Sequence, residues 1–254
     1  MRAIGVLSLG IMALVSAVVG FRLLALGWRT RQQPELLIAL GLLLAIVVGA
    51  PLSTVGRIPG VALTPLGDVV FASGLAAVQM GIAFFCIFTW LVFRRDALWA
   101  TALMAFLVGL CGVEWLGIVT ASASGDTLAV VLPRTRPWGI AIVSTVAFVF
   151  AWSGYESLAH YRRLRRQLAL GLGDPVVANR LGLWAVAGFA TTALCCVIDG
   201  CMLAGLAPLG HAVPLAAIGV AALTASACWT LAFLPPEAYL VSIRHRAAGA
   251  GAAP

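Results

Sequence analysis

The sequence contains no lysine and few charged residues of any kind. Only 10% of its 254 residues are charged, whereas 62% are hydrophobic. Soluble globular chains are about 25% charged and about 45–50% apolar. The composition therefore excludes an ordinary soluble domain. The long apolar runs between the charged residues instead predict an all-α integral membrane protein with several spans.

The scarcity of histidine and the lack of common catalytic motifs exclude several kinds of site. The three histidines, His160, His211 and His245, form no HxxxH pair. Membrane hydrolases of the adiponectin-receptor and ceramidase type need several metal-binding histidines, and a haem held by two histidines needs both at one depth. The sequence also has neither a CxxC nor a GxSG motif. We therefore expect no catalytic residues, no metal centre and no cofactor.

The net charge of +7 does not indicate nucleic-acid binding. All 16 basic residues are arginines, and they stand in short clusters between apolar runs. This is the pattern of cytoplasmic segments in membrane proteins, and it differs from a basic face that follows phosphates. The six cysteines fall inside apolar runs, so we expect reduced packing residues. Gly109, Gly112 and Gly117 are expected to let their helix approach its neighbours closely.

Seven apolar stretches are long enough to cross a bilayer, which takes about 20 mainly apolar residues. They cover approximately 3–27, 35–55, 67–93, 97–122, 138–160, 175–206 and 211–234, and they define one seven-helix domain, residues 1–234. Asp174 and Pro175 provide an N-cap and a first helical position for the sixth span. The apolar stretch 127–133 is too short to span, and we expect a strand or a re-entrant flap there.

The arginines predict the orientation of the seven spans. With the N-terminus outside, the cytoplasmic segments hold twelve arginines and the outer segments hold four. The twelve are Arg22, Arg29, Arg31, Arg94, Arg95, Arg162, Arg163, Arg165, Arg166, Arg180, Arg244 and Arg246, and the four are Arg2, Arg57, Arg134 and Arg136. We therefore expect a multi-pass protein of the cell (inner or plasma) membrane with a cytoplasmic C-terminus.

The residues after the seventh span form a short tail. Pro235 and Pro236 end the span, and 238–246 reads as an amphipathic helix on the membrane surface within a cytoplasmic tail, 235–254. Seven spans, an outer N-terminus and a surface helix resemble the topology of rhodopsin-type proteins and G-protein-coupled receptors. This resemblance covers architecture and includes no shared motif. A retinal pigment needs a lysine for its Schiff base, so covalent retinal is excluded.

Acids within the spans are the main candidates for a site, because a charge at membrane depth costs about 2.5–3.5 kcal/mol on insertion scales. Glu114 lies about 25 Å from the cytoplasmic end of the fourth span. Asp199 lies at a similar level on the sixth, and Asp68 begins the third. With Arg57 and His211 at the outer side, we expect a ligand or ion pocket in the outer half. The alternative is that each acid pairs with an arginine or the backbone and holds helices together.

A second group of candidates lies at the cytoplasmic end of the fifth span. Glu156 and His160 are four residues apart and therefore share a helix face. They precede a basic loop, 162–166, in which we expect Arg162, Arg163, Arg165 and Arg166 to contact a partner. The alternative for Glu156 is a pair with a nearby arginine.

These features favour a seven-helix membrane sensor or receptor-like module. It would bind a small or lipidic ligand at the outer acids and signal through the basic cytoplasmic loop. A small-solute or proton-coupled transporter is the alternative, and a non-catalytic subunit of a membrane complex is the second alternative. The expected partners are the lipid bilayer, a cytoplasmic or membrane protein, and a second copy of the chain. Nucleic acid is not among them.

Overall fold

The computed structural model describes residues 2–58, 60–62, 64–122, 128–207 and 210–250, and all regular secondary structure in these ranges is helical. The elements are α1 (Arg2–Thr30), α2 (Gln33–Leu42), the π-helix η1 (Leu43–Gly49), α3 (Ala50–Val55), α4 (Pro65–Phe93), α5 (Leu98–Ser122), α6 (Leu128–Ala169), α7 (Pro175–Leu203), α8 (Ala212–Phe233) and α9 (Glu237–Ala250). Within these ranges seven helices are long and apolar enough to cross a membrane, with α2, η1 and α3 forming one of them.

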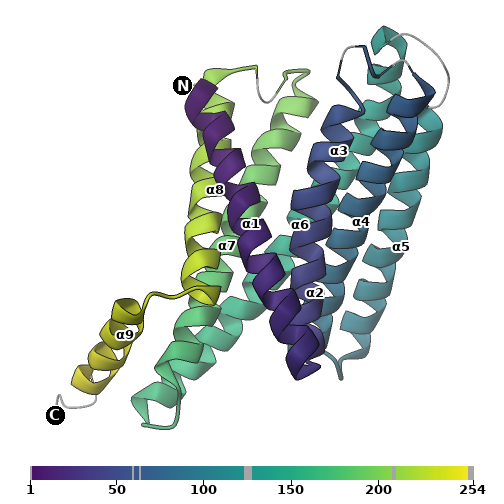
Figure 1. Cartoon of the computed structure of the whole chain (residues 1–254). Coiled ribbons are helices and arrows are strands. Elements are labelled where there is room, and N and C mark those ends of the chain that lie inside the picture. The colour runs from purple at the N-terminus through teal and green to yellow at the C-terminus, as the bar shows by residue number, and fades with distance from the viewer. Residues whose placement is uncertain (1, 59, 63, 123–127, 208–209, 251–254) are drawn as a thin grey trace.

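The helices form two groups that share α6 (Figure 1). On one side α2, η1 and α3 pack along α4, and α4 packs against α5. On the other side α6, α7 and α8 pack in sequence order. Helix α1 crosses the front of the bundle and contacts both α2 and α8. The α6–α7 hairpin extends beyond the other helices, and α9 projects from the bundle near that end.

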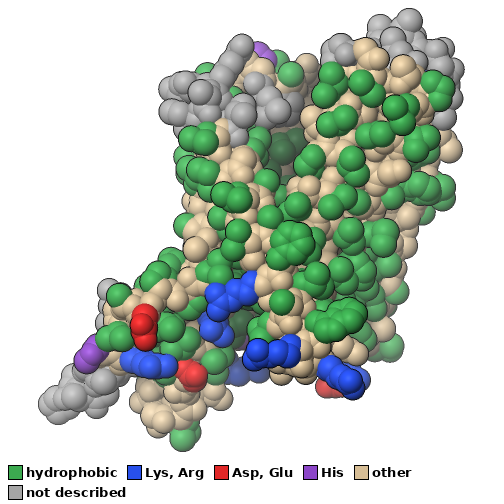
Figure 2. Space-filling view, viewed as in Figure 1, with side chains coloured by type: hydrophobic (Ala, Val, Ile, Leu, Met, Phe, Trp, Pro, Cys, Tyr) green, Lys and Arg blue, Asp and Glu red, His purple; other side chains and the backbone are tan. Residues whose placement is uncertain are grey.

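Many large apolar side chains lie on the surface of the bundle, and some polar side chains are buried in its otherwise apolar interior. Large apolar residues such as Leu14, Phe21 and Phe106 are each more than 60% exposed, whereas Gln79 and Glu114 are buried. Hydrophobic side chains cover much of the visible face between the two ends (Figure 2). A surface of this kind is stable against lipid. The seven apolar helices and this surface describe a multi-pass helical membrane bundle.

A seam of glycines brings the second and third spans together. Gly67, Gly74 and Gly81 of α4 are seven residues apart, so they lie on one face of the helix. A Cβ atom on Gly74 would collide with the backbone nitrogen of Ser53, and one on Gly81 would lie 2.6 Å from the backbone nitrogen of Ala45. The two backbones therefore approach as closely as glycine allows.

The π-helix keeps the second span in register with this seam. On the second span Gly49 and Gly56 are seven residues apart, but Gly41 and Gly49 are eight apart. A π-helical turn takes one residue more than an α-helical turn. Because η1 lies between Gly41 and Gly49, all three glycines face α4, where they meet Phe85, Val78 and Phe71.

Helix α6 is longer at both ends than the sequence indicated. The prediction of a strand or re-entrant flap at 127–133 is wrong for residues 128–133, which belong to α6, while Thr127 lies outside the described residues. Pro133 and Pro137 are both exposed and one turn apart. The two backbone positions without an N–H group therefore lie on the same exposed side of the helix.

The basic segment 162–166 is also helical, which corrects the prediction of a loop. Arginine is a good helix former, and no helix-breaking residue occurs before Gly171. Gly171 has a φ of 73°, Leu172 donates to the carbonyl of Gln167, and Gly171 donates to that of Leu168. This is a Schellman ending, which only a residue tolerant of the left-handed region completes without strain. The same ending at Gly205 stops α7 at Leu203 rather than at residue 206.

The glycines expected to mediate close packing in the fourth span behave differently from one another. Gly117 packs against the ring of Trp138. Gly109 and Gly112 are exposed and have no neighbouring atom where a Cβ would stand, so the expectation for them is wrong. Composition alone does not distinguish a glycine at a seam from one that faces lipid.

We predict that Gly74→Ala destabilises the protein and that Gly112→Ala does not. The added methyl group at position 74 meets backbone, which cannot rotate away, and overpacking of this kind costs about 1–3 kcal/mol. At position 112 the methyl group meets open space, so helix propensity gives no loss or a gain of up to about 1 kcal/mol. Thermal unfolding of both variants in detergent, followed by tryptophan fluorescence, measures the difference. Equal melting temperatures would show that the seam is not tightly packed.

Candidate functional site

A buried carboxyl group from α5 joins three helices. Glu114 is 1% exposed. Nε2 of Gln79 on α4 donates to its Oε2 atom at 2.9 Å, and the hydroxyl of Thr145 on α6 donates to its Oε1 atom at 2.6 Å. We call Gln79, Glu114 and Thr145 the Glu114 cluster. Each of three consecutive spans contributes one residue to it.

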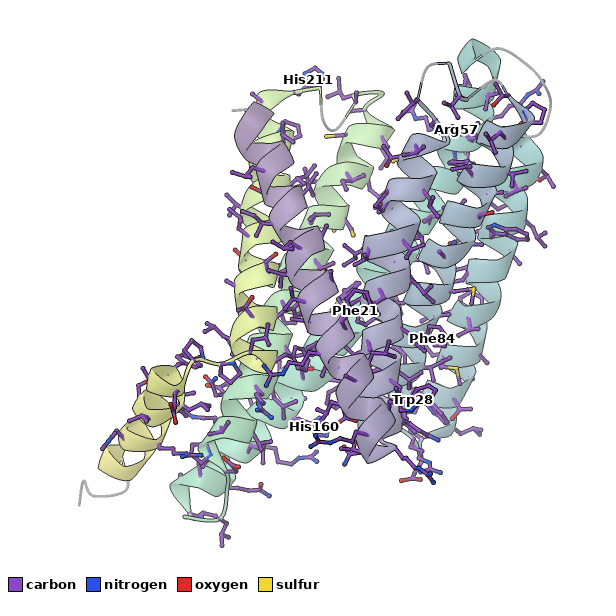
Figure 3. All side chains as sticks on the ribbon, viewed as in Figure 1. Phe21, Trp28, Arg57, Phe84, His160 and His211 are labelled. Atoms are coloured by element: carbon purple, nitrogen blue, oxygen red, sulfur yellow. The ribbon has the colours of Figure 1, made fainter. Side chains whose placement is uncertain are left out.

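Apolar layers enclose the Glu114 cluster on both sides along the bundle. Leu75, Ile118 and Ile142 form a buried layer one helical turn towards the end of the bundle that holds Arg57 (Figure 3). One turn in the other direction, Ile82, Cys111 and Val149 are buried in the main core. The indole of Trp115 donates to the carbonyl of Ala72 at 3.0 Å and fixes the register of α5 on α4. The carboxyl group therefore lies in an apolar interior, with hydrogen bonds in place of solvent.

The Glu114 cluster contains no basic residue. In the described part of the chain, the two ion pairs between side chains involve Asp68 and Glu156, not Glu114. Gln79, which is 4% exposed, uses its NH2 group for the bond to Glu114, and its Oε1 atom is buried without a hydrogen-bond partner. The cluster thus has one acidic group, neutral donors and one unused acceptor.

Asp199 of α7 bonds to Ser144, the residue next to Thr145 of the Glu114 cluster on α6. The hydroxyl of Ser144 donates to Oδ2 of Asp199 at 2.8 Å, and Ser144 directly precedes Thr145. Asp199 is half-buried, and its Oδ1 atom has no hydrogen-bond partner. Consecutive hydroxyl groups of α6 therefore bind the two acids that the sequence identified within the fourth and sixth spans.

The remaining outer candidates lie apart from these acids. Arg57 pairs with Asp68 at 3.3 Å, and its guanidinium group lies 3.8 Å from the centre of the Phe71 ring. His211 is exposed and precedes α8. Figure 3 shows Arg57 and His211 at the same end of the bundle but over different groups of helices. The structure thus pairs Arg57 with Asp68, links Glu114 and Asp199 through α6, and leaves His211 separate.

The candidates that the sequence assigned to the cytoplasmic side centre on an ion pair with a buried carboxylate. Nε of Arg94 donates to Oε1 of Glu156 at 2.8 Å, and Glu156 is 1% exposed. This hydrogen bond raises the pKa of the Arg94 guanidinium above its ordinary value. His160 contacts the backbone carbonyl of Glu156, not its carboxylate, and its ring lies 4.9 Å from that of Phe93. Glu156 is therefore paired with an arginine, the alternative left open by the sequence.

Sequence reasoning missed three neutral residues of the site: Gln79, Ser144 and Thr145. A signal for one of them was present, because Gln79 is the only glutamine inside any of the seven predicted spans. Serine and threonine are common in spanning helices, where they bond to their own backbone. Ser144 and Thr145 were therefore not distinguishable from the other hydroxyl residues of α6.

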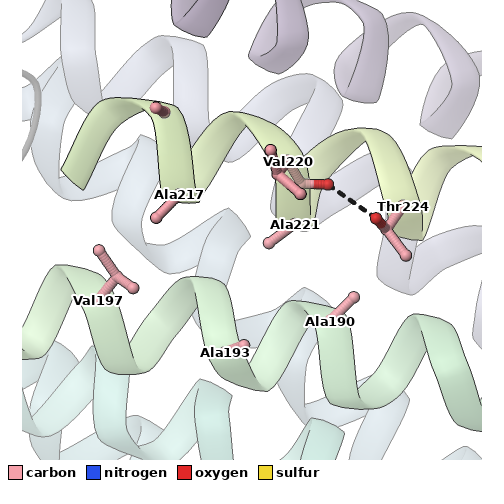
Figure 4. Close-up of a pocket in the computed structure, with 8 residues that line it drawn as sticks. Ala190, Ala193, Val197, Ala217, Val220, Ala221 and Thr224 are labelled. Atoms are coloured by element: carbon pink, nitrogen blue, oxygen red, sulfur yellow. Dashed lines mark hydrogen bonds between the residues drawn. The ribbon is translucent and has the colours of Figure 1, made fainter. Parts of the chain in front are cut away.

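A groove on the surface of the bundle is separate from these residues. It runs between α7 and α8 and is lined by Ala190, Ala193, Val197, Ala216, Ala217, Val220, Ala221 and Thr224 (Figure 4). The hydroxyl of Thr224 donates to the carbonyl of Val220 in its own helix. The groove is thus an apolar surface without a free polar group from these eight residues.

The fold and the site together define a class: a multi-pass helical membrane bundle with acidic groups in its interior. In the described residues, no three His, Cys, Asp or Glu side chains gather in a way that could hold a metal ion. No protein-family model matches the chain, and comparison with curated proteins and with solved structures found no match.

We predict that Thr145→Val destabilises the protein, whereas Thr224→Val has little effect. Valine has nearly the shape of threonine, but it leaves Oε1 of Glu114 buried without a donor, which costs about 1–3 kcal/mol. Thr224 is partly exposed and bonds its own helix, so the matched change there removes no hydrogen bond between helices. Thermal unfolding of the two variants tests this. If both lose the same stability, the bond to Glu114 contributes nothing specific.

We predict that Arg94→Gln destabilises the protein and that Arg95→Gln does not. Removal of one partner of a buried pair costs about 3–5 kcal/mol, and partial exposure of Arg94 reduces this to about 1–3 kcal/mol. Arg95 is exposed and forms no ion pair within the described residues. The double variant Arg94→Gln/Glu156→Gln should regain part of the loss. A double variant less stable than Arg94→Gln alone contradicts the pair.

Proposed function

We propose that the protein is a seven-helix membrane sensor. In this proposal, a change at Glu114 or Asp199 moves α6, and the movement reaches the cytoplasmic end of that helix. One observation supports this most directly. A single helix, α6, contains the hydroxyl groups that bind both acids, the buried partner of Arg94, and the arginine-rich segment 162–166. Thr145 and Arg166 are 21 residues apart, or about 32 Å along the helix axis.

The distribution of charge supports the orientation that this proposal requires. The arginines visible in Figure 2 gather at the end opposite His211, and that end holds the α6–α7 hairpin. Arginines flanking spans remain in the cytoplasm. We therefore propose that this end is cytoplasmic, that the N-terminus lies outside, and that the host membrane is the cell membrane.

Helix α9 has the position expected of a surface helix in this orientation. It begins after Pro236, contacts α7, and is held there by reciprocal hydrogen bonds between Tyr239 and Asn179. Its exposed Arg244 and its place beside the arginine-rich end suit the headgroup region of a membrane. We propose that α9 lies on the cytoplasmic surface of the bilayer.

The end of α6 is the proposed output surface. Arg162, Arg163, Arg165 and Arg166 are exposed and form no ion pair within the described part of the chain. Four guanidinium groups on two helical turns fit the acidic surface of a partner protein. Movement of α6 would change the position of this surface relative to the bilayer and to α4.

The proposal predicts that a change at the Glu114 cluster moves the cytoplasmic end of α6. Spin labels at Arg166→Cys and Arg95→Cys, in a Cys196→Ser background, report the separation of α6 and α4, because the other five cysteines are buried. Thr145→Val removes the bond between α6 and Glu114, and we expect the distance distribution from double electron–electron resonance to shift or broaden by several ångströms.

Thr224→Val provides the matched control, since it changes a threonine whose hydroxyl group bonds only its own helix, α8. Identical distributions for Thr145→Val and the unmodified protein would mean that the cluster does not control the end of α6. Ion uptake by reconstituted liposomes that depends on Glu114 would then favour the proton-coupled transporter. Stoichiometric co-purification with another membrane protein, without uptake, would favour a non-catalytic subunit.

A further inference from the structure

The hydrogen bonds of the Glu114 cluster leave one group unused. The carboxyl oxygens of Glu114 accept from Gln79 and Thr145, but the amide oxygen of Gln79 is buried and accepts from no donor. An unsatisfied buried acceptor costs about 1–3 kcal/mol. A rotation of the amide by half a turn would bring this oxygen to the carboxyl group, but two acceptors would then face each other.

A positive charge between these oxygens removes the conflict. Glu114 lies between two apolar layers, and no basic side chain pairs with it in the described residues. A carboxylate at such a place is costly without a counter-charge. The carboxyl group of Glu114, the amide of Gln79 and the hydroxyl group of Thr145 each contribute oxygen atoms to the cluster. Small hard cations prefer oxygen ligands.

We infer that the Glu114 cluster is a binding site for one small monovalent cation, delivered as H⁺ or as Na⁺. A proton on Glu114 donates to the rotated amide oxygen of Gln79. A sodium ion is held by the same amide oxygen, the carboxylate of Glu114 and the hydroxyl oxygen of Thr145. In both cases the hydrogen bond from Gln79 Nε2 to Glu114 is lost, and a contact of the Gln79 amide oxygen with the bound cation replaces it. The inference rests on the proposed function, because it names what the internal acid would sense.

Thermal unfolding of the purified protein tests the site. The melting temperature is measured in sodium chloride and in choline chloride at equal ionic strength, over a range of pH. A cation that binds only the folded state raises the melting temperature, so we expect a rise of several degrees with sodium or with acidification. In Glu114→Gln the new NH2 group donates to the Gln79 oxygen without any cation, so this variant should be at least as stable and should lose the response.

Asp68→Asn is the control for acids outside the cluster, and it should respond as the unmodified protein does. Gln79→Leu distinguishes the two cations, because it removes a sodium ligand but leaves Glu114 able to hold a proton. A sodium response of the unmodified protein that Gln79→Leu abolishes identifies Na⁺. An acid response of the unmodified protein without a sodium response, with an infrared carboxylic-acid band that disappears in Glu114→Gln, identifies H⁺.

Equal responses in the unmodified protein and in Glu114→Gln would overturn the inference. Failure of Glu114→Gln to fold would also overturn it, since the amide has the same net charge as the cation-loaded carboxyl. The spin-label distances test the sensor proposal independently of the cation site. A cation response without movement of α6 supports the site and removes the sensor, and movement without a cation response supports a sensor for another ligand.

Discussion

The carboxyl group of Glu114 imposes the constraint on which the arrangement of the third, fourth and fifth spans depends. A buried acid needs donors, and no single neighbouring helix supplies both. Gln79 and Thr145 must each turn their side chains to the same point, which fixes the rotation of α4 and α6 about their axes. The apolar layers above and below then follow one turn away on all three helices. A polar contact thus specifies which of many similar apolar faces meet.

Glycine lets helices pack closely within each half of the bundle, and polar groups add hydrogen bonds and an ion pair to the apolar packing between the halves. The glycine seam holds the second span against α4, and Gly188 of α7 packs on the backbone of Gly154 in α6. These contacts between backbones leave little room for movement. The bonds from α6 to Glu114 and to Arg94 run between the halves instead. Relative motion of α6 would therefore change hydrogen bonds and ion pairs before it disturbed either seam.

The number of spans followed from the sequence because burial in lipid requires long apolar segments, and each predicted segment is confirmed as a helix. The ends of α6 did not follow. The prediction began this span at residue 138 and placed the arginines in a loop, yet residues 128–137 and 162–166 are helical. Arginine itself favours helix. The left-handed glycines at 171 and 205 mark the C-terminal ends of α6 and α7, which depend on local geometry that a hydropathy pattern does not contain.

The candidate site was predictable only where charge made a residue conspicuous. Glu114 and Asp199 are acids in apolar runs, so the cost of placing a charge at membrane depth is enough to identify them from the sequence. Their partners are neutral, and a threonine that bonds another helix has the same sequence signature as one that bonds its own. The pairing of Arg57 with Asp68 and the placing of His211 over another group of helices than Arg57 depend on which helices are neighbours. That information lies in the packing.

A double-mutant cycle between Gln79→Leu and Thr145→Val tests the central claim most directly. These two residues contribute to the cluster only through Glu114, from helices on opposite sides of it. If the three residues act as one unit, the free energies of unfolding of the two single variants will not add, and a coupling of about 0.5–3 kcal/mol is expected. Strict additivity would contradict the account, because it would mean that each bond contributes alone and that Glu114 joins nothing.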